Sequence, residues 1–418
     1  MIRRISFVAL LIGVAAPTLA QTALAQTAHA QTALPPEPAV HEAIASHPSV
    51  LAADARVEAA KAEARGLRAG PHEFNFQASH MRRSVQGLGN VAEYDATLTH
   101  AIRLPGKGRL DREAGDFGVT AAQNRAEDAR HQAATLLNDL WWDWLGASAE
   151  ARVDAQGVAN YEATLASIKR RVEMRDMAPL EADQTGAALG EARTAAAQSR
   201  GKADLARARL MARFPGLALP DESPEPPQPK LPVETFETMA AQVIERSHEI
   251  GAAKAESARM TAVADRARKD RIADPSIGVR LFSEQGGRER GAGLVVSMPI
   301  GGGNRRAVAD MAEAEGQAAA AELAAVRLDV QEMASRDVTR AHSAMQAWER
   351  AREALNAQMA ALSKTRRGHQ LGAIDLSDVL LAERLTHAAF RSEALARAEA
   401  NRAINCLLID SHNLWIAD

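Results

Sequence analysis

The segment Ile102–Arg109, IRLPGKGR, recurs about 200 residues later as Pro299–Arg306, PIGGGNRR, with a glycine and the final arginine at matching positions. Two further pairs of segments match in the same order: Ser46–Ala53 with Ser247–Ala253, where one residue is dropped, and Ala178–Asp183 with Ala373–Asp378. Three matches in a constant order and at a similar offset indicate that the chain contains a duplicated unit.

The duplication divides the chain into a first repeat at 34–213, a connector at 214–233 and a second repeat at 234–416. The connector contains seven prolines: Pro215, Pro220, Pro224, Pro226, Pro227, Pro229 and Pro232. Because proline donates no backbone hydrogen bond and fixes φ, this segment is neither a helix nor a central strand. We expect an extended connector, and an ordinary disordered linker is the alternative.

Each repeat is predicted to contain a helix, a pair of strands, a long helix, a turn and a second long helix. Alanine and charged residues recur at helical spacing over Val40–Arg68 and Phe236–Arg271. These helices are expected to stop at Gly70-Pro71 and Asp274-Pro275, because the residue before proline avoids the helical region.

Strict alternation of apolar and polar residues predicts four strands at about 72–85, 91–104, 275–284 and 291–300. The apolar side of this alternation consists of Phe74, Phe76, Ala78, Tyr94, Ala96, Leu98, Ile277, Val279, Leu281, Ala292, Leu294, Val296, Met298 and Ile300. Glycine-rich turns at Gly87–Asn90 and Gly286-Gly287 are expected to close two hairpins.

Two long helices follow the hairpins, over Arg109–Arg175 and Arg306–Gln370, each of about 65 residues and about 100 Å at 1.5 Å per residue. Leu137, Leu140, Trp141 and Trp144 recur at helical spacing and form an apolar stripe. The tryptophan cluster is therefore expected to pack between helices rather than to bind a ligand. Each long helix ends in a turn from which another helix returns, so the fold class is mainly α with a small β part, built from antiparallel helical hairpins and β-hairpins.

The N-terminus has the features of a secretory signal peptide at 1–25: Arg3 and Arg4, an apolar run from Ile5 to Ala16, and small residues that allow cleavage after residue 20, 25 or 30. The mature protein is therefore expected to be exported. The chain has one cysteine, Cys406, which excludes an intrachain disulfide and does not lie where N-terminal lipidation requires it.

Composition excludes several classes of protein. The formal net charge is −3, with 25% charged residues, which argues against binding nucleic acid through bulk positive charge. No nucleophile is paired with a base, so an enzyme is not expected. No His-x-x-x-His, Cys-x-x-Cys or His-Glu-x-x-His motif is present, and Gly106-Lys107-Gly108 lacks the rest of a Walker loop, so neither a metal centre nor a cofactor is predicted. His72, His80 and His100 are weighed as contacts for passing cations or as ordinary hydrated residues.

Four strands do not close a barrel, and lipid offers no hydrogen-bond partner to an open strand edge. Three copies would supply twelve strands. In element order, duplication, signal peptide and proline-rich midpoint, nearly the whole mature chain resembles the TolC family of outer-membrane efflux channels. The motifs that carry this resemblance are His47-Pro48-x-Val50 with Ala52-Ala53, Leu104-Pro105-Gly106-Lys107, and Gly372-Ala373-x-x-x-x-Asp378-Val379-Leu380-x-Ala382.

The resemblance implies a homotrimer with a 12-stranded β-barrel in outer-membrane lipid and an α-helical barrel in the periplasm. It also implies a passive conduit for an inner-membrane resistance-nodulation-division pump and its periplasmic adaptor, which dock at the helix tips around Ala178, Pro179, Gly372 and Ala373. Gly106-Lys107-x-Arg109 is similar to the heavy-metal, CzcC-like branch, although glycine and lysine are also a simple strand terminator. The alternatives are a multidrug or small-organic efflux channel and a periplasmic adaptor-like coiled coil.

The resemblance further implies a gate of carboxylates at the periplasmic tips. Asp378 matches the first acidic position, Asp183 is its equivalent in the first repeat, and Leu381 stands where some members have a second acid. A solvated carboxylate that favours the helix N-terminus is the simpler explanation, and it suits Asp375 better than Asp378. Five arginines near the tips are candidates to latch the mouth through ion pairs: Arg366, Arg367, Arg170, Arg171 and Arg175.

Overall fold

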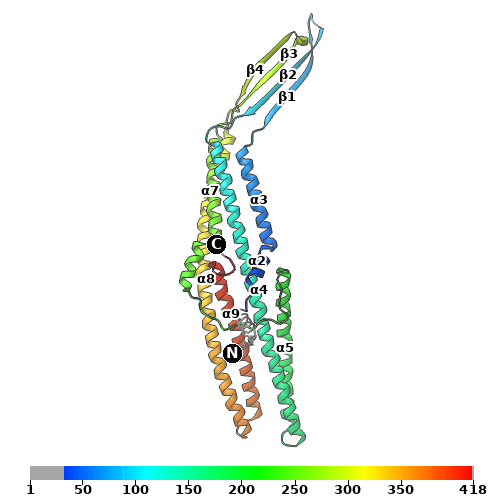
Figure 1. Ribbon diagram of the computed structural model, residues 1–418, viewed down its shortest axis with the longest axis vertical. Helices are drawn as coiled ribbons and strands as arrows, with labels where there is room; N and C mark the ends of the chain where they lie inside the picture. Colours follow the sequence, from blue (N-terminus) through cyan, green and yellow to red (C-terminus); the bar gives the residue numbers. More distant parts are fainter. Residues whose placement is uncertain (1–32, 88, 417–418) are drawn as a thin grey trace, which may run out of the picture.

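The computed structural model describes residues 33–87 and 89–416, so the predicted signal peptide lies outside the described residues. The molecule is elongated, with a sheet at one end and long helices that extend from it to two tips at the other end (Figure 1). None of the helices in the described part of the chain combines the length and the apolar character needed to cross a membrane.

The elements of the two halves follow the same order. The first half contains α2 (Glu37–Ala45), α3 (Pro48–Ala69), β1 (Phe74–Val85), β2 (Gly89–Ala101), α4 (Lys107–Glu173) and α5 (Pro179–Arg213). The second half contains α6 (Phe236–Glu245), α7 (His248–Lys269), β3 (Ser276–Glu284), the short η1 (Gln285–Gly287), β4 (Glu289–Ser297), α8 (Gly303–Gln370) and α9 (Leu376–Asp410). The long helices α4 and α8 have 67 and 68 residues, and α5 and α9 have 35 each.

The helices predicted over Val40–Arg68 and Phe236–Arg271 are each divided in two. The first is interrupted at His47, which is extended because Pro48 follows it. The second is interrupted at Ser247, whose Oγ accepts a hydrogen bond from the backbone N–H of Ile250 at 3.1 Å and caps α7. The local breaks occur at matching positions and so belong to the duplicated unit.

The four strands form one antiparallel sheet in the order β1-β2-β3-β4. Phe76 lies opposite Leu98, Leu98 opposite Val279, and Val279 opposite Leu294. Strands β2 and β4 end earlier than the predicted boundaries of 104 and 300. Beyond β2 the chain leaves the ladder, because the N–H of Leu104 binds the side chain of Asp274 instead of a neighbouring strand.

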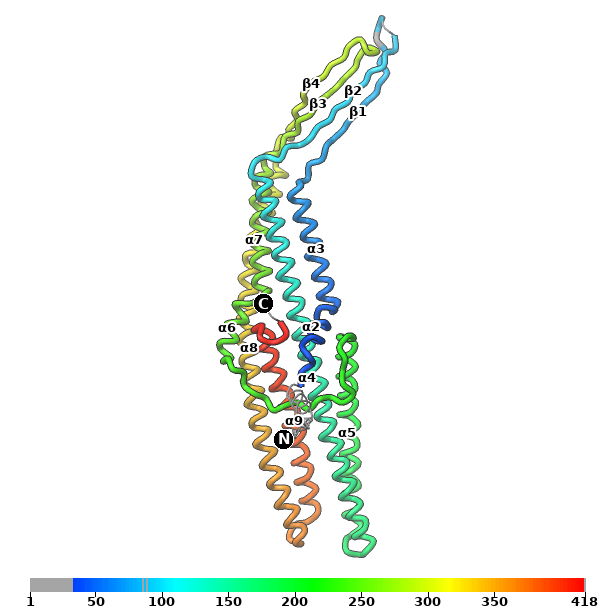
Figure 2. Tube along the Cα trace, viewed as in Figure 1, coloured from blue at the N-terminus to red at the C-terminus, as the bar shows by residue number. Residues whose placement is uncertain are grey.

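The connector is ordered and crosses the middle of the helices between α5 and α6 (Figure 2). Arg152 of α4 donates hydrogen bonds to the carbonyl and the hydroxyl of Ser223, at 3.0 and 2.8 Å. Asn401 of α9 donates to the carbonyl of Pro227 at 2.9 Å. The extended segment is therefore held against both repeats, and the disordered-linker alternative is wrong.

The predicted packing role of the tryptophan cluster is confirmed. Trp141, Trp142 and Trp144 are all buried in a core that α4 shares with α2, α3, α5 and the connector. The indole N–H of Trp141 donates to the carbonyl of Ala33 at 2.8 Å. A second core lies among α6, α8 and α9, and a third lies nearer the tips among α4, α5 and α9.

Candidate functional site

One face of the sheet is apolar and is not covered by any other element of the described chain. Directly paired residues of an antiparallel sheet share a face, so the register places together those predicted apolar positions that lie within the four strands, whereas Met298 and Ile300 lie beyond the end of β4. Leu294 is 87% exposed and Phe76 is 69% exposed. Burial of such side chains is worth about 1.5–3 kcal/mol each, so this face calls for an apolar environment.

The opposite face is polar, as the alternation predicts. It carries Asn75, Thr97, Asp95 and Arg280, and the last two form an ion pair across β2 and β3. His80 and His100 lie on the apolar face, where they stack on Tyr94 and Phe74 at ring separations of 4.7 and 4.5 Å. These histidines therefore pack against aromatic rings, and the structure does not bring them together as a cation path.

Lys107 anchors the junction between the sheet and the helices. Gly106 adopts a left-handed conformation with φ 84°, which turns the chain sharply into α4. The Lys107 side chain is only 1% exposed, and its Nζ lies 2.7 Å from Asp270, 2.8 Å from Asp274 and 2.8 Å from the carbonyl of Ile272. The Gly-Lys pair thus ties the first repeat to the end of α7 in the second repeat.

Asp274 gathers donors from both repeats. It accepts hydrogen bonds from Lys107 and from the backbone N–H of Leu104, and its second oxygen lies 2.9 Å from Nε2 of His72. Burial opposes ionisation of this carboxyl, but the hydrogen bonds outweigh burial and lower the pKa of Asp274 to about 2. His72 is accordingly a junction residue, and the carboxylate remains ionised at neutral pH.

The two tips have the same backbone geometry. At the end of α4, the N–H of Asp176 donates to the carbonyl of Arg171 at 2.8 Å, and at the end of α8 the N–H of Ala373 donates to the carbonyl of Gly368 at 2.9 Å. Both ends are Schellman caps that require a residue with positive φ. Gly372 fills that position in the second repeat at φ 73°, and Arg175 fills it in the first repeat at φ 62°.

The predicted docking and gate residues are accessible at these tips. Ala178, Pro179, Gly372 and Ala373 are all exposed. Asp183 and Asp378 are also exposed, near the starts of α5 and α9, and no hydrogen bond or ion pair joins them to each other within residues 33–87 and 89–416. Asp375 occupies the N-cap of α9, as the helix-start explanation expects.

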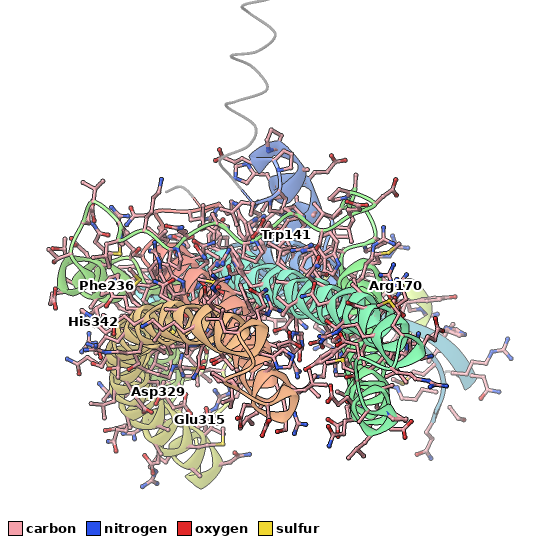
Figure 3. All side chains as sticks on the ribbon, turned by 90° about the horizontal axis from the view of Figure 1, so that it is seen from below. Trp141, Arg170, Phe236, Glu315, Asp329 and His342 are labelled. Atoms are coloured by element: carbon pink, nitrogen blue, oxygen red, sulfur yellow. The ribbon has the colours of Figure 1, made fainter. Side chains whose placement is uncertain are left out.

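The arginines form local pairs rather than contacts with these acids. Arg366 of α8 binds Glu383 of α9 with an Nη2–Oε1 distance of 2.8 Å, inside one helical hairpin. Arg171 binds Asp176 at 2.8 Å, inside one tip. Arg367 and Arg175 are exposed on the same tips, and Figure 3 shows Arg170 near the tip of α4. The structure therefore places the candidate latch residues at the tips without linking them to Asp183 or Asp378.

A buried charge network that the sequence did not suggest joins the two hairpins above the tips. Asp154 and Glu150 of α4 are almost fully buried. Nε2 of His387 lies 2.9 Å from Asp154, and Arg391 pairs with both acids. The hydrogen bond that Arg391 donates to the carboxylate of Glu150 raises the pKa of Arg391. His387 approaches closely because Gly157 has no side chain, and an added Cβ would lie 2.6 Å from the imidazole. The sequence did contain one signal for this network, because acidic residues occur within the apolar stripe of α4.

The outer side of α8 exposes apolar residues at positions that are buried in α4. Asp111 and His131 of α4 face α7, where they bind Arg266 and Glu249. Their equivalents, at the offset that aligns Arg109 with Arg306, are Val308 and Leu328 of α8, which are 47% and 66% exposed. Figure 3 shows that Glu315 and Asp329 of α8 also lie at the periphery. This side of α8 lacks the helix that covers α4.

Comparisons with known proteins give a consistent fold. No family model and no curated protein sequence matches the chain. Among solved structures, a membrane protein from Pseudomonas aeruginosa is similar over 90% of this chain and 89% of its own, with a TM-score of 0.77 and 17% identity. The outer membrane protein VceC from Vibrio cholerae gives a TM-score of 0.74 at 17% identity, over 93% of this chain and 96% of its own.

The outer membrane channel MtrE from Neisseria gonorrhoeae, solved in its open state, gives a TM-score of 0.70 at 16% identity, over 91% of this chain and 89% of its own. Each of these similarities extends over both repeats, because each covers at least 89% of both chains. The chain therefore has the TolC-like fold that the sequence motifs predicted.

Proposed function

We propose that this protein is the outer-membrane channel of a tripartite efflux system, a passive conduit that works as a homotrimer and is not an enzyme. The observation that carries the proposal is the apolar face of the sheet, shared by four strands in register and exposed at the end of a helical body. Solved structures with the same fold, described as outer-membrane proteins and channels, support it.

Trimer formation supplies the partners that one chain lacks. β1 and β4 are each paired on one side only, and an unpaired edge is costly in lipid. The exposed apolar positions of α8 stand where a neighbouring helix is needed. A second and a third copy of the chain would pair the edge strands and cover the exposed positions of α8 through one repeated interface. The result is twelve strands around one axis.

The tips are the proposed contact with a periplasmic adaptor and an inner-membrane resistance-nodulation-division pump. Ala178, Pro179, Gly372 and Ala373 present small, exposed residues on rigid caps, which suits the close approach of another helical tip. Asp378, with Asp183, is the proposed gate, and Arg366, Arg367, Arg171 and Arg175 are the proposed latch. Because Arg366 pairs with Glu383 within one hairpin and Arg171 pairs with Asp176 within one tip, the latch acts by stiffening these local structures.

Heavy-metal cations are the proposed substrate class, on the resemblance of Gly106-Lys107-x-Arg109 to the CzcC-like branch. The buried position of Lys107 explains this motif by its contacts at the junction. Small organic molecules are therefore a second candidate. Deletion of the gene should sensitise cells to divalent metals under the first proposal and to organic compounds under the second.

Cysteine labelling tests the membrane assignment. In a Cys406→Ser background, Phe76→Cys and Leu294→Cys should react with a lipid-soluble probe in intact outer membranes. Asn75→Cys and Ser297→Cys, on the polar face, should react with a water-soluble maleimide. Equal labelling of all four positions by the aqueous reagent would overturn the assignment.

A further inference from the structure

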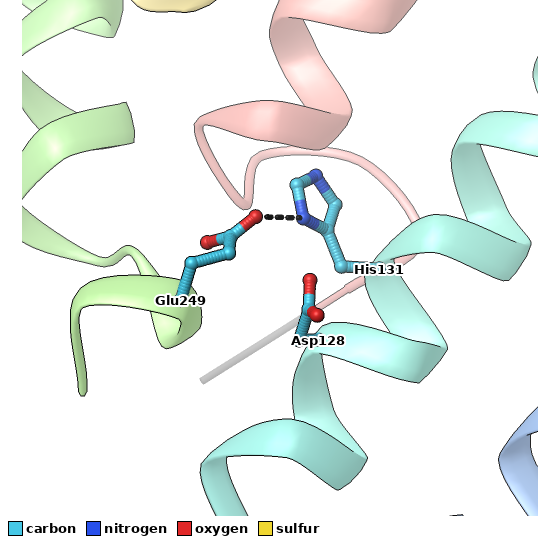
Figure 4. Close-up of side chains that lie close together, drawn as sticks. All are labelled: Asp128, His131 and Glu249. Carbon is cyan, nitrogen blue, oxygen red and sulfur yellow. Dashed lines mark ion pairs between the residues drawn. The ribbon is translucent and has the colours of Figure 1, made fainter. Parts of the chain in front are cut away.

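Three side chains that could ligate a metal converge where α4 meets the start of α7. Asp128 and His131 lie one turn apart on α4, and Glu249 lies in the first turn of α7 (Figure 4). One potential ligand atom from each residue lies within 4.8 Å of the other two. Nδ1 of His131 and Oε1 of Glu249 are 3.9 Å apart.

Each of the three side chains is oriented by a separate outer partner. Nε2 of His131 lies 2.8 Å from Oδ1 of Asp410. The hydroxyl of Ser247 donates to Oε2 of Glu249 at 2.7 Å, and the amide of Gln132 donates to Oδ2 of Asp128 at 2.9 Å. These contacts leave Nδ1 of His131, Oε1 of Glu249 and Oδ1 of Asp128 facing the centre.

One of the central atoms lacks an ordinary hydrogen-bond partner. Oδ1 of Asp128 is buried and forms no hydrogen bond within the described residues. The His131 side chain is 7% exposed, and its Nδ1 lies 3.9 Å from Oε1 of Glu249, which is beyond hydrogen-bond distance. Buried polar atoms are costly unless they are paired, so a cation at this centre would satisfy Oδ1 of Asp128 and bridge it to the other two side chains.

We propose that Asp128, His131 and Glu249 form a binding site for a divalent transition-metal cation of the Zn²⁺ class. One imidazole nitrogen and two carboxylate oxygens are ligands that Zn²⁺ accepts, with water in the fourth position. Tetrahedral coordination at about 2.0–2.2 Å requires ligand atoms about 3.3–3.6 Å apart, so rotamer shifts of the two carboxylates complete the site. Asp410 supplies the carboxylate–histidine contact that commonly fixes a metal-binding imidazole.

A neighbouring trio, Asp337, Cys406 and Asp410, is a poorer site. The Cys406 thiol donates to Oδ2 of Asp410 at 3.4 Å, and burial together with that carboxylate raises the pKa of the thiol. A protonated thiol is a hydrogen-bond donor, whereas a metal ligand must be a thiolate. Asp410 is thus already engaged on both oxygens and acts as an outer partner of His131.

The site would join the two repeats. Its ligands come from α4 in the first repeat and α7 in the second, and the side chain of Glu249 is 27% exposed, which gives an ion a route from solvent. The ring of His412 lies 5.8 Å from that of His131, and the ring of His248 lies 5.0 Å from that of His412. A bound cation would hold the duplicated halves together independently of the substrate that the protein exports.

Metal binding by the full-length protein in detergent tests the proposal. After removal of metal with a chelator, dialysis against Zn²⁺ should load one ion per chain, measured by mass spectrometry of the metal. X-ray absorption should show nitrogen and oxygen ligands without sulfur. His131→Gln and Glu249→Gln should weaken binding at least tenfold, and Asp410→Asn should weaken it about 10- to 100-fold.

Glu127→Gln is the matched control, because Glu127 is an exposed carboxylate on the same turn of α4 that binds Arg130. It removes the same charge and should leave Zn²⁺ affinity unchanged. Circular dichroism and oligomeric state establish that each variant is folded, and Glu249→Gln is the second variant should His131→Gln fail to fold. The proposal is overturned by absence of stoichiometric binding, by unchanged affinity in Glu249→Gln, or by sulfur ligation that disappears in Cys406→Ser.

Discussion

The long helices α4 and α8 occupy equivalent places in the two repeats, yet α4 has more than twice as many buried residues as α8. α4 contacts α3 and α7 toward the sheet and α5 and α9 toward the tips, whereas α8 contacts α7, α9 and the short α6. The same duplicated element is thus central in one repeat and marginal in the other. The difference supports the proposal that another copy of the chain completes the second repeat.

The junction between sheet and helix is also more buried in the first repeat than in the second. Lys107 is buried among carboxylates, whereas its equivalent, Asn304, is exposed. We expect Lys107→Ala to destabilise the protein by about 3–5 kcal/mol, because it leaves buried carboxylates without their cation. Asn304→Ala should change the free energy of unfolding by no more than about 0.5 kcal/mol. Denaturant unfolding of the two variants in detergent measures the contrast, and equal effects would contradict it.

Acid should weaken the Lys107 contact in a defined range. The pKa of Asp274 is about 2 in the folded protein, compared with an ordinary value of 3.8. The ionised carboxylate therefore makes its full contribution to folding stability above about pH 4. This contribution is lost as the pH falls from about 4 toward 2. The stability difference between the wild type and Lys107→Ala should therefore shrink over that range.

We expect the next largest effect, a loss of trimers, from a substitution on the exposed side of α8. Leu328→Asp should convert trimers to monomers, because it replaces an interface side chain whose burial is worth about 1.5–3 kcal/mol with a charge, three times per assembly. Leu231→Asp, at a similarly exposed leucine of the connector, is the control and should leave trimers intact. Light scattering of the detergent-solubilised protein distinguishes the two results. A stable Leu328→Asp trimer would show that this face of α8 is not the interface.

The charge network between α4 and α9 tests whether the hairpins are held together above the tips. His387→Ala should destabilise the protein by about 1–3 kcal/mol, because Asp154 is left with one fewer partner in a buried place. It should also raise single-channel conductance, since the hairpins would separate more easily. His41→Ala, at an exposed histidine of α2, should alter neither quantity. Unchanged conductance with lowered stability would assign the network a purely structural role.

The two tip caps offer a smaller and reciprocal test. Arg175 occupies a left-handed position that glycine occupies in the other repeat, and this conformation costs a non-glycine residue about 1–2 kcal/mol. Arg175→Gly should therefore be neutral or stabilising, and Gly372→Arg should destabilise by about 1 kcal/mol. Thermal unfolding of both variants gives the comparison. The same sign for both changes would mean that side-chain contacts, not backbone conformation, dominate at the tips.

Much of this architecture could be predicted because it depends on local pattern. Alternation identified the strand faces, and the register later aligned Phe76, Leu98, Val279 and Leu294 on one side. The breaks at His47 and Ser247 were missed. A capping residue interrupts the helical spacing of the apolar residues for only a few positions, so the pattern still looks like one continuous helix. From the sequence, Lys107 could be assigned only to a branch motif or to a strand terminator, since nothing in its sequence neighbourhood reveals a carboxylate 167 residues away.

The candidate sites also differ in whether their residues are close together in the sequence. Tip residues such as Asp378 lie in local motifs and could be named from the sequence. The Asp154–His387 pair spans 233 residues, and the cluster of Asp128, His131 and Glu249 joins two repeats, so searches for ligands at short spacing could not find either. Residues brought together by packing between repeats therefore become visible only in the structure.

Asp378 provides the last test, with the smallest expected effect on stability. Three copies of this exposed carboxylate near a threefold axis would concentrate negative charge at the tips and favour cations in the pore. Asp378→Ala should reduce cation selectivity and block by multivalent cations, while the free energy of unfolding changes by no more than about 0.5 kcal/mol because the side chain lies outside the packed cores. Reversal potentials in planar bilayers under a salt gradient measure the selectivity directly, and Asp183→Ala asks whether the first repeat contributes a second ring. Asp375→Ala separates the gate explanation from the helix-start explanation of Asp378, since Asp375 occupies the N-cap of α9. If Asp378→Ala and Asp375→Ala leave both the reversal potential and the cation block unchanged, Asp378 is a solvated charge at a helix start, and the gate must be formed by other residues.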